Sequence, residues 1–207
     1  MSHTPEDLYV DFLLEQPYLE EEQAERDREV VESFTQERLK AYYVAHADVA
    51  QKPIAALANA KTLLNAQEPR AALVMAGVAI EVGYKAALLK PVVSSLVHNA
   101  AMADLVTELA TSHTGLERFS GILQAILAEF AGVDLKTFVR KGSNESLWTE
   151  MKIVAERRNA VVHRGEDADP AATRVAIAVA DTLLNELLPM LFGKIGLKIV
   201  AGRITGD

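Results

Sequence analysis

The chain contains no cysteine and has few glycines, prolines or aromatic residues. The absence of cysteine excludes disulfide bonds and thiolate metal sites. Only 11 glycines and 7 prolines occur in 207 residues, and alanine, leucine and valine dominate, which favours helices. Aromatic residues make up 6% of the chain and hydrophobic residues 50%, so one domain with a real core and a modest extension is expected.

Uncharged apolar runs are also scarce. No targeting segment is visible at the N-terminus, because residues 1–34 are acidic and interrupted by charge. The longest apolar run, residues 71–89, has the length of a membrane span but carries Glu81 and Lys85, which would be costly in a bilayer. A buried core helix is the better interpretation, and we expect a cytoplasmic protein without a membrane partner.

Motifs for cofactors and metals are absent from the sequence. No phosphate-binding glycine loop, dinucleotide fingerprint or nucleophile elbow is present, so no cofactor is expected. His46 with Asp48 and His113 with Glu117 have loosely metal-like spacings, but neither pair belongs to a recognised set of three or four ligands. We therefore expect no metal site.

Apolar periodicity predicts an all-α fold, since no strand-alternating α/β pattern occurs. Pro91 is expected to end or kink the apolar helix, in which small residues would allow close approach of a neighbour: Ala72, Ala76, Ala79 and Gly83. The β-branched segment 195–204 reads as a short strand or a tail. Helices are expected at about 19–45, 48–65, 69–89, 100–110, 116–130, 145–163 and 170–188.

These elements divide the chain into three parts. Residues 1–45 form an acidic helical arm, residues 46–192 a helical bundle, and residues 193–207 a C-terminal tail that the pattern allows to be a short strand. Residues 1–34 hold eleven acidic residues and only two arginines within a chain of net charge −8. Residues 140–165, in contrast, hold six basic and three acidic residues, so a basic segment is expected on an acidic body.

The most informative stretch is Arg157–Gly165, at the end of the helix expected at 145–163. Arg158 falls on the central line of its apolar stripe, and a guanidinium keeps its charge, so it must meet a carboxylate, a phosphate or a partner subunit. Asn159 and His163 are four residues apart and share one edge of the helix. The apolar residues of the stripe are Leu147, Trp148, Met151, Val154, Ala155, Val161 and Val162.

The pattern Arg158-Asn159-Ala160-Val161-Val162-His163, followed by a glycine turn and a long helix, resembles the HEPN superfamily. The apolar helix that contains Glu81 is similar to an earlier helix of that bundle, and the resemblance covers about residues 48–192. It implies a compact HEPN-like helical bundle that dimerises about a two-fold axis. It also implies metal-independent endoribonuclease activity that yields a 2′,3′-cyclic phosphate.

The resemblance makes Arg158 and His163 the catalytic pair, with Asn159 and Glu81 in support. RNA would contact the nearby cations Arg157, Arg164 and Lys152. Five residues separate the catalytic pair by about 140° of rotation on a helix. A cleft composed from two subunits is favoured, and the alternative is that His163 lies past the fraying helix end and swings back. Such an activity implies a toxin or defence effector, held in check by an antitoxin or acting within a defence system with a partner protein.

Other interpretations remain open from the residues alone. His163 and Arg164 can simply complement the helix dipole. Arg158 can form a structural ion pair with Glu81, which can instead pair only with Lys85. A non-catalytic HEPN-like module that binds a nucleotide or a partner protein is the main alternative function. A purely structural helical oligomer is the third.

Overall fold

The computed structural model describes residues 36–97 and 132–206, together with residues 101–102, 105–106, 121, 124–125 and 127–128. The chain divides into two compact units, Met1–Arg38 and Leu39–Asp207. Most of the arm expected at 1–45 lies outside the described residues, as do His113, Glu117 and most of the helices expected at 100–110 and 116–130. The features below belong to the second unit.

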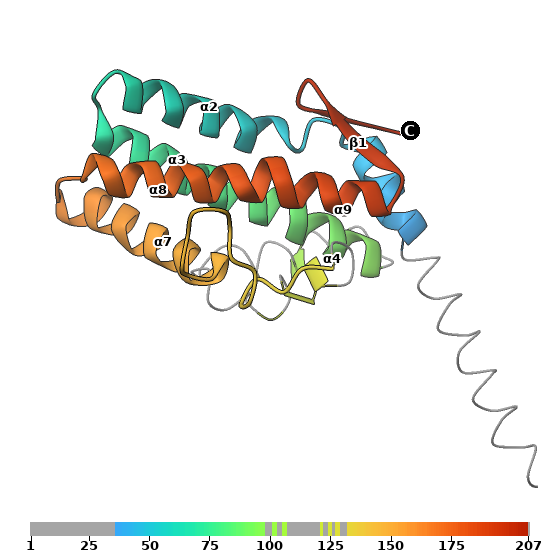
Figure 1. Ribbon diagram of the computed structural model, residues 1–207. Helices are drawn as coiled ribbons and strands as arrows, with labels where there is room; N and C mark the ends of the chain where they lie inside the picture. Colours follow the sequence, from blue (N-terminus) through green and yellow to red (C-terminus); the bar gives the residue numbers. More distant parts are fainter. Residues whose placement is uncertain are drawn as a thin grey trace, which may run out of the picture. The chain divides into compact units, whose positions relative to one another are not determined.

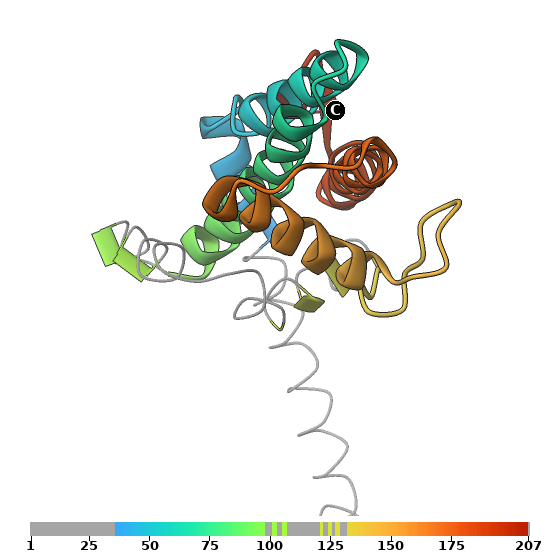
Figure 2. The ribbon, with the colours of Figure 1, turned by 90° about the vertical axis from the view of Figure 1, so that its left-hand side faces the viewer.

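The helix α3 (Pro69–Tyr84) is the centre of this unit. It packs against α2 (Gln51–Asn65), α7 (Leu147–Arg164) and α8 (Pro170–Asp181). Figures 1 and 2 show α3 between α2 and α7, with α8 alongside. The described residues are mostly helical, which confirms the all-α class.

Two long helices continue through a proline. α3 passes into a π-helical turn, η1 (Lys85–Leu89), and then into α4 (Lys90–Leu96). Of the two outcomes expected for Pro91, an end or a kink of the helix, the end is therefore wrong, because the three segments follow one another without a break. The same arrangement recurs in α8, η3 (Thr182–Leu187) and α9 (Leu188–Lys194), so the last helix extends beyond the expected residue 188.

The hydrogen bond from Tyr43 explains how the helix tolerates Pro91. In an α-helix the amide of residue 91 would donate to the carbonyl of Ala87, but proline has no N–H. The buried hydroxyl of Tyr43 donates to that carbonyl instead, at 2.7 Å. Burial raises the pKa of Tyr43, with a smaller contribution from neighbouring Tyr42, so the hydroxyl keeps its proton for this bond. The Tyr43 ring also packs edge-on against Phe192, with 4.7 Å between ring centroids.

The small residues expected on α3 are all buried. A Cβ atom added at Gly83 would lie 2.7 Å from Leu184 Cδ2 and 3.6 Å from Pro53 Cβ. The glycine therefore lets η3 and α2 approach the helix closely. This confirms the expected packing role of the small residues.

Both continuous apolar helices are long enough to cross a membrane by length and composition. They cover Pro69–Ser95 and Pro170–Lys194, and 61% of the most apolar window of each is buried inside the protein. These two helices pack against the other helices of the bundle, and this burial explains why so many of their side chains are apolar.

The loop before α7 docks onto the first turn of that helix. The amides of Leu147 and Trp148 donate to the carbonyls of Phe138 and Leu135, at 2.8 and 3.1 Å. Ser146 is the N-cap, and its hydroxyl accepts the amide of Thr149. The amides at the helix start thus find partners in the loop and the cap. At the other end Gly165 adopts a left-handed conformation with φ of 69°, as the sequence pattern predicts.

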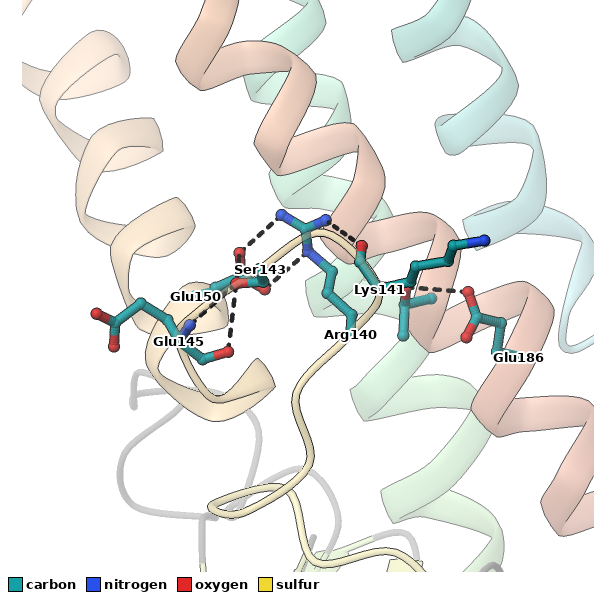
Figure 3. A network of polar contacts seen from close by, with 7 residues as sticks. Arg140, Lys141, Ser143, Glu145, Glu150 and Glu186 are labelled. Carbon is teal, nitrogen blue, oxygen red and sulfur yellow. Dashed lines mark hydrogen bonds and ion pairs between the residues drawn. The ribbon is translucent and has the colours of Figure 1, made fainter.

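A buried carboxylate fixes the same loop. Glu150 is only 6% exposed and accepts two hydrogen bonds from Arg140, through Nε and Nη2, each at 2.8 Å. Ser143 Oγ donates a third hydrogen bond to this carboxylate at 2.9 Å (Figure 3). The apolar stripe of α7 therefore includes a buried acid. Val162, which the periodicity places on the stripe, is 50% exposed.

The C-terminal segment forms a two-stranded antiparallel sheet. Strands β1 (Leu197–Val200) and β2 (Arg203–Gly206) pair with Ile199 opposite Ile204. The intervening residues Ala201 and Gly202 both have positive φ, which is typical of a tight two-residue hairpin. The amide of Ile204 donates to the carbonyl of Ala47 at 2.8 Å, which joins the hairpin to the segment before α2.

We expect Tyr43→Phe to lower the free energy of unfolding by roughly 1–3 kcal/mol, because it leaves the buried Ala87 carbonyl without a donor. The measurement is urea unfolding monitored by circular dichroism. The control is the same substitution in a Pro91→Ala background, where an amide at position 91 can supply the missing bond. An equal loss in both backgrounds would contradict this account of Pro91.

Candidate functional site

Arg158 projects from α7 toward α3 and is held there by two side chains. Its Nη2 donates to Glu81 Oε2, and its Nη1 donates to Asn159 Oδ1 at 2.9 Å. The side chains of Arg158 and Glu81 are 25% and 36% exposed. The ion pair between Arg158 and Glu81, one of the alternatives that the sequence left open, is therefore confirmed. The site lies at the edge of the core, within reach of solvent.

Glu81 also pairs with Lys85. Lys85 Nζ lies 2.8 Å from Glu81 Oε1, one helical turn further along the same helix. The two pairings considered from the sequence thus occur together, each on a different oxygen of one carboxylate. One carboxylate therefore contacts two cations.

Gly77 makes room for the Arg158 side chain. A Cβ atom added at this glycine would lie 3.1 Å from Arg158 Cγ and 3.2 Å from Arg158 Cβ, closer than ordinary van der Waals contact. Gly77 is four residues before Glu81, so both lie on one face of α3. The sequence reasoning missed Gly77. Its spacing from Glu81 was the available signal.

His163 lies apart from this cluster, in the last turn of α7. It is exposed, and no contact joins it to Arg158 among the interactions of the described residues. The separation follows from helix geometry, since five residues correspond to about 140° of rotation. The structure brings Arg158 together with Asn159 and Glu81. It does not bring Arg158 together with His163 within one copy.

The three cations expected to bind RNA have different surroundings. Arg164 Nε lies 2.6 Å from Glu166 Oε1, in an exposed ion pair. Arg157 lines a pocket of about 300 Å³ whose walls also carry three carboxylates, those of Glu166, Asp167 and Asp169. Lys152 is partly buried on α7. Acidic residues therefore lie next to Arg164 and Arg157, two of the three cations expected to contact RNA.

Asp169 has a structural role at the start of α8. Its carboxylate accepts the amides of Ala171 and Ala172, at 3.2 and 3.1 Å. These two backbone hydrogen bonds are the main cause that lowers the pKa of Asp169, with smaller effects from Arg174 and Arg157. The carboxylate therefore remains ionised beside the end of α7 at neutral pH.

The acids that follow Gly165 offset the basic segment. Residues 140–165 have three more basic than acidic residues, but Glu166, Asp167 and Asp169 come directly after them. Over residues 140–169 the chain has six basic and six acidic residues, so this stretch is neutral overall.

Comparisons with models of known protein families, with curated proteins and with solved structures gave no match. The chemistry of the site is consequently argued from its own residues. They comprise an arginine oriented by a carboxylate and an amide, and an exposed imidazole at the end of the same helix.

We expect Gly77→Ala to lower the free energy of unfolding by about 1 kcal/mol, because the new methyl group crowds Arg158. The measurement is chemical denaturation. Gly193→Ala is the matched control, since nothing lies within 4 Å of a Cβ added there, and it should be neutral or stabilising.

In an Arg158→Ala background Cγ is absent, so this contact cannot form. Gly77→Ala should therefore lower the free energy of unfolding by less in that background. A loss that is equal in both backgrounds would mean that Gly77 does not serve the Arg158 side chain.

Proposed function

We propose that this protein is a metal-independent endoribonuclease of HEPN type, with a composite active site at a homodimer interface. Arg158 and His163 are the catalytic pair, while Glu81 and Asn159 position Arg158. The protein acts in the cytoplasm as a toxin or defence effector under the control of an antitoxin or a defence-system partner. This proposal rests on the resemblance of residues 158–163 to the HEPN motif.

The arrangement of Arg158 supports the proposal most directly. Its guanidinium is oriented by Glu81 and Asn159, yet remains partly accessible at 25% exposure. An arginine has five N–H donors, and two of them are used in these bonds. The remaining donors suit a phosphate oxygen, and an oriented guanidinium needs little reorganisation to bind it.

The chemistry requires no metal ion. The 2′-hydroxyl of RNA attacks the adjacent phosphorus as the bond from phosphorus to the 5′-oxygen breaks. A neutral imidazole at His163 takes the proton of the hydroxyl, or a protonated one gives a proton to the leaving 5′-oxygen. Arg158 stabilises the negative charge that develops on the phosphate oxygens. The products are a 2′,3′-cyclic phosphate and a 5′-hydroxyl end.

A second copy of the chain accounts for the separation of the catalytic pair. Two α7 helices related by a two-fold axis can bring Arg158 of one copy close to His163 of the other. Val162 lies next to His163 and is 50% exposed, although its side chain is apolar. An interface at this end of α7 would cover it.

We expect the wild-type protein to cleave RNA in the presence of EDTA and to leave cyclic-phosphate ends, whereas His163→Ala reduces cleavage by roughly 100-fold or more. The measurement is gel analysis of end-labelled RNA. His46→Ala is the matched control, because His46 is also exposed but lies far along the sequence, beside the Tyr42 ring.

Growth of cells that express each variant gives a second readout, in which only His163→Ala should relieve toxicity. Cleavage that survives in His163→Ala, or that disappears equally in His46→Ala, would contradict the assignment. A folded dimer that cleaves none of several RNAs would favour the binding module described below.

Mixing two inactive variants tests whether the site is composite. A heterodimer of Arg158→Gln and His163→Ala contains one site in which both catalytic side chains are intact, if the pair comes from different subunits. After subunit exchange, statistical mixing predicts about one quarter of the wild-type activity. No recovery in a verified heterodimer would place both residues of each site in one subunit or exclude the pair.

A non-catalytic HEPN-like module is the second candidate function. The observations that favour it are the ion pair that Glu81 forms with Arg158 and the carboxylates that line the pocket beside Arg157. In such a module the cluster would hold a nucleotide or a partner protein. In that case the wild type would not cleave RNA, and His163→Ala would change only the binding of the partner.

A further inference from the structure

A second pocket lies away from the Arg158 cluster, where the loop before α7 meets α8. It has a volume of about 350 Å³, within the range of small-molecule sites. Its walls come from Lys61 of α2, from Arg140 and Lys141 of the loop, and from one face of α8 and η3. Neither Arg158 nor His163 contributes to it.

Basic side chains outnumber acidic ones in this pocket. Four cations line it, against the two carboxylates of Asp181 and Glu186. Lys61 is neutralised by Asp181 at 2.5 Å, and Arg140 by Glu150. Lys141 and Arg174 are exposed and form no salt bridge within 4.0 Å of any described carboxylate, although Arg174 is near enough to Asp169 to lower the pKa of that group. The pocket therefore offers two cations to an anionic ligand.

The loop that carries Lys141 is held in place. Adjacent Arg140 is 11% exposed and is bound at both Nε and Nη2 to buried Glu150. Arg140 Nη1 also donates to the carbonyl of Lys141 at 3.4 Å. Figure 3 shows this network, with the Lys141 side chain extending toward the side where Glu186 lies. The backbone at Lys141 is thus organised before any ligand arrives.

Hydrogen-bond acceptors lie in the same pocket. Asp181 and Glu186 present carboxylates, and the Glu186 carboxylate accepts the hydroxyl of Thr182 at 3.2 Å. Such acceptors suit hydroxyl or amino groups of a ligand and repel a continuous polyanion. The combination of two cations with two acceptors indicates a small ligand that carries one anionic group and several donors.

We propose that this pocket binds a phosphate monoester that also bears hydroxyl or amino groups, the chemistry shared by nucleotides and sugar phosphates. Lys141 and Arg174 hold the phosphate, because a dianion is matched by two cations. Asp181 and Glu186 accept hydrogen bonds from the rest of the ligand. This site does not depend on the proposed nuclease activity.

Isothermal titration calorimetry with adenosine monophosphate and with glucose 6-phosphate tests the proposal. At least one of these probes should bind, and Lys141→Ala and Arg174→Ala should each weaken binding about tenfold, the effect of losing one charged hydrogen bond. Lys194→Ala is the matched control, because Lys194 is an exposed cation on α9 that does not line the pocket. The Lys194→Ala variant should bind the probes with the affinity of the wild type.

The preference between the two probes distinguishes a nucleotide from a sugar phosphate. No binding of either probe at about 10 mM, or equal weakening by Lys194→Ala, would overturn the proposal. Titration of His163→Ala separates this site from the nuclease, since that variant should bind the probes as the wild type does. Both pocket substitutions change exposed side chains, so circular dichroism should report unchanged folding.

Discussion

The permanent charge of Arg158 constrains how α7 can pack on α3. The guanidinium stays protonated, so the helix interface must provide both space and a counter-charge. Gly77 provides the space, and Glu81, one turn further along α3, provides the carboxylate. Asn159 binds a second nitrogen and limits rotation of the side chain. With Arg158 fixed against α3, the helical twist leaves His163 exposed at the end of α7.

Features that arise from local periodicity were predictable from the sequence, whereas those that need distant partners were not. The limits of α7, its terminal glycine and the ion pair of Arg158 with Glu81 agree with the sequence pattern. The helix that runs through Pro91 receives a hydrogen bond from Tyr43, which is 44 residues from the carbonyl it binds. Burial of Glu150 likewise depends on Arg140 in a loop with no periodicity. The HEPN-like arrangement itself and the catalytic roles remain predictions.

The electrostatic attraction of a basic segment for RNA depends on the acidic residues that lie around it in the fold. A basic segment at 140–165 looked suited to RNA, yet acids directly after Gly165 pair with Arg164 and share a pocket with Arg157. The stretch 140–169 is neutral as a result. Strong attraction of any polyanion is therefore not expected from this end of α7. A nuclease of this design would owe its selectivity to the few positions where a phosphate meets a cation.

Glu81 gains a particular importance from this scarcity of positive charge. A carboxylate that fully neutralised Arg158 would weaken its hold on a phosphate, but Glu81 is shared with Lys85. The shared carboxylate can therefore orient the guanidinium, which keeps further N–H donors for an anion. This property serves a nucleotide-binding module and a nuclease equally well, because both require a bound phosphate. Only a group that moves a proton separates them, and the proposed nuclease assigns that part to His163, in the last turn of α7.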